Sequence, residues 1–207
     1  MKLLVATRSL GKQREVRRIL EGSGIEILFP DDAGIVPALV EETLEVADTF
    51  AANARAKAEF FARQSGLPTV ADDSGIEVLA LGGEPGVKSR RWAGASGSES
   101  QIDAANNALL LRRLAGAPES KRGARYRCVL VLYRTPRGFP ETFEGACPGR
   151  ILEAPQGTGG FGYDPLFYST ELGKSFGEAS PAEKDAVSHR GRAFRALRDA
   201  LSSTPET

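Results

Sequence analysis

Pro68-Thr69-Val70-Ala71-Asp72-Asp73-Ser74-Gly75 sets two adjacent carboxylates directly after a short apolar run. The β-branched run predicts a strand, and Gly75 predicts that this strand ends in a tight turn. Ligand sites on α/β sheets lie outside the carboxyl ends of strands, which makes the turn a candidate site. Neighbouring carboxylates repel each other, so we expect cationic side chains to compensate them. A plain surface turn is the alternative interpretation, because Asp, Ser and Gly are common turn residues.

The composition narrows the class of protein. A chain of 207 residues with 41% hydrophobic content can bury the core of one domain. Its 27 basic and 27 acidic residues give a net charge of +0, so no global field attracts nucleic acid or an anionic membrane. The apolar runs are too short for a signal peptide or a membrane span, and we expect a cytoplasmic protein. Two cysteines and one histidine make neither a disulfide scaffold nor a zinc site, although the two cysteines can still pair.

A second candidate site lies near the amino end. Leu3 to Thr7 predicts a buried strand, and Gly11-Lys12-Gln13-Arg14-Glu15 opens an amphipathic helix. A strand that passes through a short turn into a helix directs free backbone N–H groups and the positive end of the helix dipole at that turn. This geometry suits a phosphate, and Lys12 adds a cation. The pattern is not a Walker loop, because Gln13 follows Lys12 where Ser or Thr would stand.

A helix over residues 48–64 carries a row of polar side chains. Thr49, Asn53 and Lys57 recur every four residues, so they stack along one face. Such a row is usually solvated surface. It gains interest because Glu45 precedes the helix and the acidic stretch follows it. A strand over 25–29 and a loop over 30–37 come before this helix.

The rest of the chain predicts further strands and two capped helices. Strands are expected at 76–81, 126–133, 141–147 and 150–153. Ser98 with Gln101 predicts a capping box at the start of one helix. Ser180-Pro181-Ala182-Glu183 predicts the start of another, which should continue past residue 190 with Lys184 and Ser188 on one face. The polar end of the chain, 203–207, should be frayed.

The loop Gly157-Thr158-Gly159-Gly160-Phe161-Gly162-Tyr163-Asp164-Pro165 interleaves glycines with two aromatic rings. Glycines let the backbone approach a ligand closely, and a ring offers a stacking face. The alternative is a glycine-rich loop that only connects two elements, and the composition alone favours that interpretation. The one histidine, His189, lacks a serine or cysteine nucleophile motif around it, and a lone histidine is more often structural.

Taken together and in this order, these stretches resemble the inosine triphosphate pyrophosphatase family, also called the Ham1 or RdgB-like family. The stretches that carry the resemblance span nearly the whole chain: Thr7 to Lys12, Thr49-Phe50, Asn53-Ala54, Lys57-Ala58, Ala71 to Gly75, Pro85-Gly86, Gly159 to Phe167, Glu183-Lys184 and Ser188-His189-Arg190. The resemblance implies an α/β fold with an elongated mixed sheet flanked by helices, in a single domain of two lobes with a central cleft. It also implies a homodimer.

Three positions depart from the family pattern. Ser9 stands where the family's first loop has an asparagine, and its shorter hydroxyl can still donate a hydrogen bond. Ala52 stands where the family often has glutamate. Lys88 stands where a tyrosine is common. The acidic charge is then left to Glu45 and the Asp72-Asp73 pair.

The resemblance implies hydrolysis of non-canonical purine nucleoside triphosphates (dITP, ITP, XTP, dXTP) to the monophosphate and pyrophosphate, which cleanses the nucleotide pool. Glu45 and Asp73 would hold Mg²⁺, a hard ion that prefers oxygen ligands. Asp73 would also orient or deprotonate the water that attacks the α-phosphorus, with Asp72 raising its basicity. The residues expected to bind the substrate are Thr7, Arg8, Ser9, Leu10, Gly11, Lys12, Asn53, Lys57, Ser74, Phe161, Gly162, Tyr163, Asp164, Lys184, His189 and Arg190.

The resemblance implies that phosphate oxygens are held by the loop amides and by Lys12, Lys57, Lys184 and Arg190. Base selection is expected from other members of that set, together with Arg190. Phe161 and Tyr163 would form stacking or pocket walls, and Asp164 would pair with ring N–H groups. His189 and Arg190 would donate to the 6-keto oxygen of hypoxanthine or xanthine. An adenine amino group would leave these donors unpaired, at about 1–3 kcal/mol each.

Two other functions fit parts of this pattern. A related house-cleaning pyrophosphatase for other modified nucleotides would share the acid and lysine residues and differ in its base selectivity. A non-catalytic nucleotide sensor would accommodate the changes at Ser9 and Ala52. A nucleic-acid-binding protein is disfavoured, because no basic stripe with interleaved aromatic residues is present.

Overall fold

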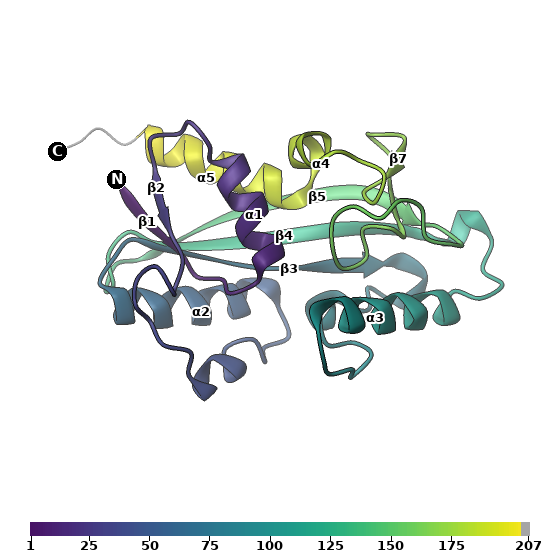
Figure 1. Cartoon of the computed structure of the whole chain (residues 1–207), viewed down its shortest axis with the longest axis horizontal. Coiled ribbons are helices and arrows are strands. Elements are labelled where there is room, and N and C mark those ends of the chain that lie inside the picture. Colours follow the sequence, from purple (N-terminus) through teal and green to yellow (C-terminus); the bar gives the residue numbers. More distant parts are fainter. Residues whose placement is uncertain (204–207) are drawn as a thin grey trace. The chain divides into compact units, whose positions relative to one another are not determined.

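The computed structural model describes residues 1–203, apart from the side chain of Glu42. It is an α/β fold with a seven-stranded mixed sheet flanked by helices, in the strand order β2-β1-β3-β4-β5-β6-β7 (Figure 1). β1 is parallel to β2 and β3, whereas β6 is antiparallel to β5 and β7. The strands are β1 (Lys2–Val5), β2 (Glu26–Leu28), β3 (Thr69–Val78), β4 (Gly123–Tyr133), β5 (Pro140–Ile151), β6 (Phe167–Ser169) and β7 (Lys174–Ser175). The α-helices are α1 (Leu10–Ile19), α2 (Phe50–Ser65), α3 (Glu99–Arg113), α4 (Pro181–Val187) and α5 (His189–Ser202).

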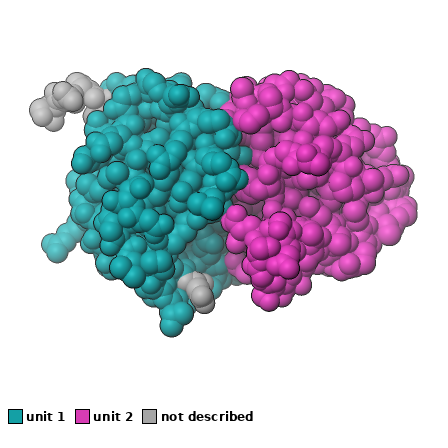
Figure 2. Space-filling model, in the orientation of Figure 1, with its two compact units in different colours: residues 1–73, 128–145, 190–207 teal, residues 74–127, 146–189 magenta. Residues whose placement is uncertain are grey.

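The chain forms two compact units (Figure 2). Unit 1 comprises residues 1–73, 128–145 and 190–207, and unit 2 comprises residues 74–127 and 146–189. No helix in the described part of the chain is long and apolar enough to cross a membrane. Cys128 and Cys147 are both buried and free, so they do not form a disulfide with each other.

In unit 1 the strands bury both of their faces. Side chains alternate along a strand, so Leu3 and Val5 pack with residues of α1 and α5, whereas Leu4 and Ala6 pack with residues of α2. Figure 1 shows the same arrangement, with α1 and α5 on one side of the strands and α2 on the other. Unit 1 therefore consists of three layers.

Unit 2 has a core of its own, which is rich in aromatic rings. Tyr126 contacts the rings of Phe167 and Phe176, with centroids 4.7 and 5.9 Å apart. α3 adds Leu110 and Leu114 to the same cluster. Its capping box forms as predicted, with the Ser98 and Gln101 side chains each bonded to the other residue's backbone.

The predicted turn at Gly75 is wrong. β3 runs unbroken from Thr69 to Val78, so the first half of the strand expected over 76–81 is its continuation, and the second half, Leu79–Leu81, is a 3-10 helix. The strand is buried over most of its length and lies between β1 and β4. Asp and Gly are poor strand residues, and their place here depends on neighbours from distant parts of the chain.

Two other boundaries differ from the prediction. The two strands expected around Pro148 are one strand, β5, because β6 continues to pair with it from Gly149 to Ile151. A Cβ at position 149 would collide with the Tyr168 carbonyl, which explains the glycine. The last long helix is also divided, because Ser188 has extended backbone angles between α4 and α5. Serine favours the N-cap position, and it starts a new helix here.

The predicted capping box at Ser180 and Glu183 is present at the start of α4. The expected fraying of 203–207 falls almost entirely outside the described residues. Ser203 is described, and its backbone N–H still donates to the Asp199 carbonyl at 3.1 Å.

Candidate active site

The two adjacent carboxylates point to opposite faces of β3. Residues two apart on a strand point to the same face. Asp72 therefore shares the face of Val70, which packs with α1 and α5, whereas Asp73 shares the face of Ala71, which packs with α2. Strand geometry thus separates two charges that a turn would have brought together. Both are buried, with 1% and 6% of their surfaces exposed.

Asp72 is compensated by cations from two helices. Its Oδ2 lies 3.0 Å from Lys12 Nζ of α1 and 3.3 Å from Arg190 Nη2 of α5. Burial alone would raise the pKa of Asp72, but Lys12 and Arg190 outweigh it and hold the pKa far below its ordinary range. Arg190 also pairs with the buried carboxylate of Glu15. The predicted cationic compensation is therefore present at Asp72.

Asp73 has a neutral partner. Its Oδ2 accepts a hydrogen bond from Asn53 Nδ2 at 2.9 Å. Burial raises the pKa of Asp73 above its ordinary value of 3.8, and this outweighs the opposing charges of Lys12 and Lys57. Glu45, a nearby anion, adds to the increase. The carboxylate is therefore a stronger base than an exposed aspartate.

Two members of the polar row, Asn53 and Lys57, lie on the face of α2 that meets these carboxylates, whereas Thr49 is exposed and precedes the helix. Thr49 caps the helix by accepting from Ala52 N, and Asn53 and Lys57 are both buried. Lys57 Nζ donates to the Asp72 carbonyl at 2.6 Å and forms an ion pair with Glu45. Burial would raise the pKa of Glu45, but Lys57 and Lys12 hold it below 4.5.

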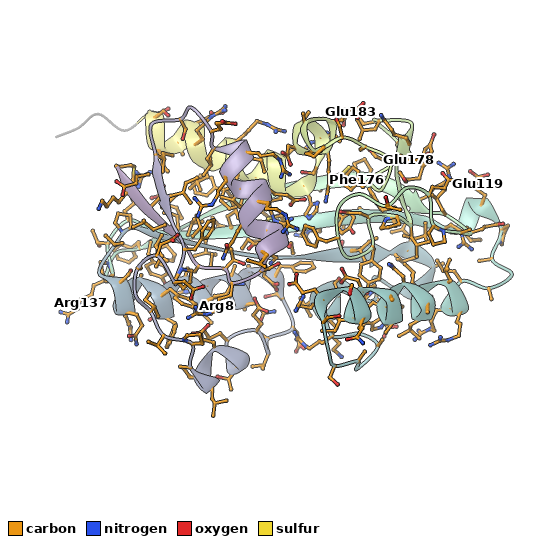
Figure 3. All side chains as sticks on the ribbon, viewed as in Figure 1. Arg8, Glu119, Arg137, Phe176, Glu178 and Glu183 are labelled. Atoms are coloured by element: carbon orange, nitrogen blue, oxygen red, sulfur yellow. The ribbon has the colours of Figure 1, made fainter. Side chains whose placement is uncertain are left out.

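The first loop leads into α1 as expected. Ser9 has the extended angles of an N-cap, and α1 begins at Leu10. Backbone N–H groups in the first turn of a helix have no partner within that helix. The Thr7 carbonyl accepts from Gln13 Nε2 at 3.1 Å, which fixes the turn. The side chain of Arg8, which is labelled in Figure 3, bonds in contrast to the segment between β2 and α2.

The glycine-rich loop of unit 2 is held from within and from α3. Asp164 Oδ2 accepts from Phe161 N at 2.8 Å, and the absence of a Cβ at Gly160 leaves space for that carboxylate. The Gly162 peptide is bonded at both ends: its N–H donates to Asp103 at 2.7 Å, and its carbonyl accepts from Asn107 at 3.0 Å.

Lys184 and His189 belong to the same unit as this loop. Lys184 forms a buried ion pair with Asp164, and its Nζ lies 4.9 Å from the centre of the Phe161 ring. His189 stacks on Tyr126 with ring centroids 4.5 Å apart and an interplanar angle of 5°. Tyr163 is a core residue whose hydroxyl donates to the Ser89 carbonyl at 2.8 Å.

A sequence model of the Ham1 family matches residues 3–200. The chain belongs to the Ham1 family. It is 49% identical over 195 residues to a dITP/XTP pyrophosphatase of Syntrophobacter fumaroxidans, covering 94% of this chain and 79% of that one. It is 48% identical over 205 residues to a dITP/XTP pyrophosphatase of Mycobacterium tuberculosis, covering 98% and 96%. The structure of a HAM1 protein from Coxiella burnetii matches 99% of this chain and 100% of its own, with a TM-score of 0.84 and 33% identity.

Within this Ham1 chain, the predicted site residues gather into two groups. Unit 1 brings together the acid–cation cluster, which we define as Lys12, Glu15, Glu45, Asn53, Lys57, Asp72, Asp73 and Arg190. Unit 2 brings together Phe161, Gly162, Asp164 and Lys184. Lys184, expected to hold phosphate oxygens, is paired with Asp164, and Arg190 lies in the cluster of unit 1.

The sequence reasoning missed several members of these groups. Glu15 follows Lys12 by three residues on one helix, a spacing that places both on the same face and would have pointed to it. Asp103 and Asn107 share a face of α3 for the same reason, but nothing local indicates that they bind a loop about 55 residues away. The stacking of His189 on Tyr126 had no signal in the sequence.

Within residues 1–203, no three His, Cys, Asp or Glu side chains are arranged to hold a metal ion. The donors of the acid–cation cluster still fit Mg²⁺, because this ion is commonly held by one or two carboxylates together with substrate phosphates and water. Glu45 and Asp73 are two such carboxylates, close enough for the charge of one to shift the pKa of the other.

Proposed function

We propose that this Ham1 protein is a Mg²⁺-dependent pyrophosphatase that hydrolyses dITP, ITP, XTP and dXTP to the monophosphate and pyrophosphate. The observation that carries the proposal is the buried pairing of a basic carboxylate, Asp73, with a neutral amide beside Lys57 and Glu45. The similarity to dITP/XTP pyrophosphatases of S. fumaroxidans and M. tuberculosis supports the substrate class.

The acid–cation cluster would act on the triphosphate. Mg²⁺, held by Glu45 and Asp73, would neutralise phosphate charge. Lys12 and Lys57 would bind phosphate oxygens, and the first loop, from Thr7 to Lys12, would contribute backbone N–H groups. Electrostatic stabilisation of this kind usually contributes more to catalysis than any other single effect.

In the chemical step, Asp73 would accept a proton from a water molecule while the oxygen of that water bonds to the α-phosphorus. The bond from the α-phosphorus to the bridging oxygen breaks, and pyrophosphate leaves with the electron pair. Removing a general base typically costs about 10²–10⁴ in rate. Because burial raises the pKa of Asp73, its ionised form is well suited to this role.

Unit 2 would recognise the base. The Phe161 ring, partly exposed beside Lys184, offers a stacking face, and His189 would donate to a 6-keto oxygen. Asp164 and Tyr163 would support the loop that carries Phe161, since both are engaged within the unit. Ser74 would contribute a hydroxyl to the substrate. We further propose that the protein is a cytoplasmic homodimer.

The test is to incubate the protein with dITP and, separately, dGTP, with and without Mg²⁺, and to resolve the products by phosphorus NMR. The proposal predicts monophosphate and pyrophosphate, formed rapidly from dITP and only when Mg²⁺ is present. Release of orthophosphate would show that a different bond is cut. Absence of turnover on both nucleotides would favour a nucleotide sensor.

A further inference from the structure

We propose that Arg8 is a positioning residue that holds the segment between β2 and α2 so that Glu45 reaches the acid–cation cluster. This inference rests on the proposed function. In this role the Arg8 side chain binds another segment of the protein, whereas the family resemblance implied that Arg8 binds the substrate.

Arg8 makes a forked contact with one carboxylate. Its Nε donates to Glu41 Oε2 at 2.7 Å, and its Nη2 donates to Glu41 Oε1 at 2.8 Å. This two-bond geometry requires a guanidinium and cannot be made by lysine. Both side chains are largely buried, with 24% and 17% of their surfaces exposed.

The same guanidinium binds the segment at two more points. Nη2 donates to the Ile35 carbonyl at 3.0 Å, and Nη1 pairs with Asp31. The guanidinium carbon also lies 5.9 Å from the centre of the Phe61 ring on α2. Arg8 therefore ties three points of the segment to the first loop and to the helix that carries Lys57.

The segment needs such a tie because much of its apolar surface faces water. Val36, Leu39, Val40 and Val46 are all exposed, whereas Phe29, Ala33, Ile35 and Leu44 pack against the core. Its regular structure is a single short 3-10 helix, Leu39–Thr43. Glu41 orders the start of that helix by accepting from Ala38 N at 3.2 Å, while Arg8 holds its carboxylate.

Glu45 follows Glu41 by four residues and reaches Lys57. The Arg8–Glu41 fork thus lies one short turn before the carboxylate proposed to hold Mg²⁺. Arg8 and Glu41 keep each other charged, since hydrogen bonding to Glu41 raises the pKa of Arg8 and hydrogen bonding to Arg8 lowers the pKa of Glu41. The fork is therefore kept above the lowered pKa of Glu41 and is lost once that carboxyl takes up a proton.

The test compares Arg8→Ala, Arg8→Lys and Glu41→Gln with the wild type. Loss of a partner that orients a metal-holding group typically costs about 10–100-fold in metal affinity. We therefore expect Arg8→Ala to raise the Mg²⁺ concentration for half-maximal dITP hydrolysis by that factor, with kcat at saturating Mg²⁺ within about 3-fold of wild type. Arg8→Lys and Glu41→Gln, which keep part of the contact, should give smaller shifts.

Hydrogen exchange of the metal-free protein provides a readout that does not depend on activity. Amides of residues 35–47 should exchange about 10-fold faster in Arg8→Ala, and those of β3 should not change. Arg17→Ala is the matched control: Arg17 pairs with Asp32 of the same segment, but at 3.6 Å and with both side chains exposed. It should leave both measurements at wild-type values.

Two results would overturn the inference. Wild-type exchange over 35–47 in Arg8→Ala would show that the tie does not hold the segment. A higher KM for dITP at saturating Mg²⁺, with an unchanged Mg²⁺ midpoint, would show that Arg8 contacts the substrate directly. If the wild type fails to hydrolyse dITP, the proposed function fails, and the exchange experiment still decides whether Arg8 positions the segment.

Discussion

On the face of β3 covered by α1 and α5, the Asp72 carboxylate meets Lys12 and Arg190, whereas on the face covered by α2 the Asp73 carboxylate meets the neutral amide of Asn53. Two adjacent residues of one type therefore have pKa values displaced in opposite directions. Burial, Lys12 and Lys57 act on both carboxylates, so the difference arises from their other neighbours: Arg190 lowers the pKa of Asp72, and Glu45 raises that of Asp73.

This difference indicates how the two carboxylates are used. Asp72 neutralises cations that the fold buries, and its lowered pKa makes it a weak base. Asp73 lies beside Glu45 and Lys57 with a raised pKa, as expected for a group that accepts a proton. Substitutions on the two faces of β3 should therefore have different consequences.

The largest effect is expected from Asp73→Asn. Turnover of dITP should fall by about 10²–10⁴, because the amide cannot accept the proton from water. The fold should persist, since the new amide oxygen can still accept from Asn53. Pyrophosphate release measures the turnover, and circular dichroism shows whether the fold persists. Asp199→Asn, at a surface pair with Arg198, is the control. Normal turnover in Asp73→Asn would show that Asp73 is not the general base.

Asp72→Asn should act mainly on stability. It leaves Lys12 and Arg190 short of a buried counter-charge, which lowers the free energy of unfolding by about 3–5 kcal/mol. Because folding lowers the pKa of Asp72, its contribution is present above the unfolded value of about 3.9 and is lost as the pH falls below it. Urea unfolding between pH 3 and 7 should therefore show a weaker pH dependence in the variant. A variant as stable as wild type at pH 7 would contradict the compensation by cations.

Asn53→Ala should cost about 1–3 kcal/mol of unfolding free energy, because it removes the hydrogen bond that the amide donates to the buried Asp73. It also removes the acceptor of the Ala47 N–H, which lies 2.8 Å from Asn53 Oδ1. Asn53→Asp keeps that acceptor and sets a second charge against Asp73, so its stability should recover as the pH is lowered. Equal stability of all three proteins at pH 7 would show that the amide is not needed there.

The smallest effect is expected from Thr49→Ala. This change removes the N-cap of α2, where Thr49 Oγ1 accepts from Ala52 N at 3.2 Å, and should cost about 1 kcal/mol. Thr49→Ser keeps the oxygen and should remain close to wild type. Thermal unfolding measures both. If the two variants lose stability equally, the methyl group and not the cap is responsible.

The parts of the structure that follow from local geometry could be predicted from the sequence. The shared face of Asn53 and Lys57 needs only the helical repeat, and the capping boxes at Ser98 and Ser180 need only a three-residue spacing. The apolar runs indicated the buried strands, because burial on both faces leaves a continuous hydrophobic signal.

Other parts depend on contacts between distant residues. Asp72-Asp73-Ser74-Gly75 has the composition of a turn, and it remains in a strand because Arg190, 118 residues away, compensates Asp72. Arg8 likewise meets Glu41, 33 residues further on. Nothing in the local sequence indicates either pairing. The cause predicted for the basicity of Asp73 was proximity to Asp72, whereas in the structure burial is the main cause.

The most direct measurement is a pH titration of the wild-type protein by carboxyl carbon NMR, with Asp72→Asn and Asp73→Asn used to assign the two signals. We predict that Asp73 titrates above the ordinary value of 3.8, while Asp72 stays ionised down to the pH at which the protein unfolds. If the two carboxylates titrate together, or if Asp72 takes up a proton at the higher pH, the two faces of β3 do not divide their roles in this way.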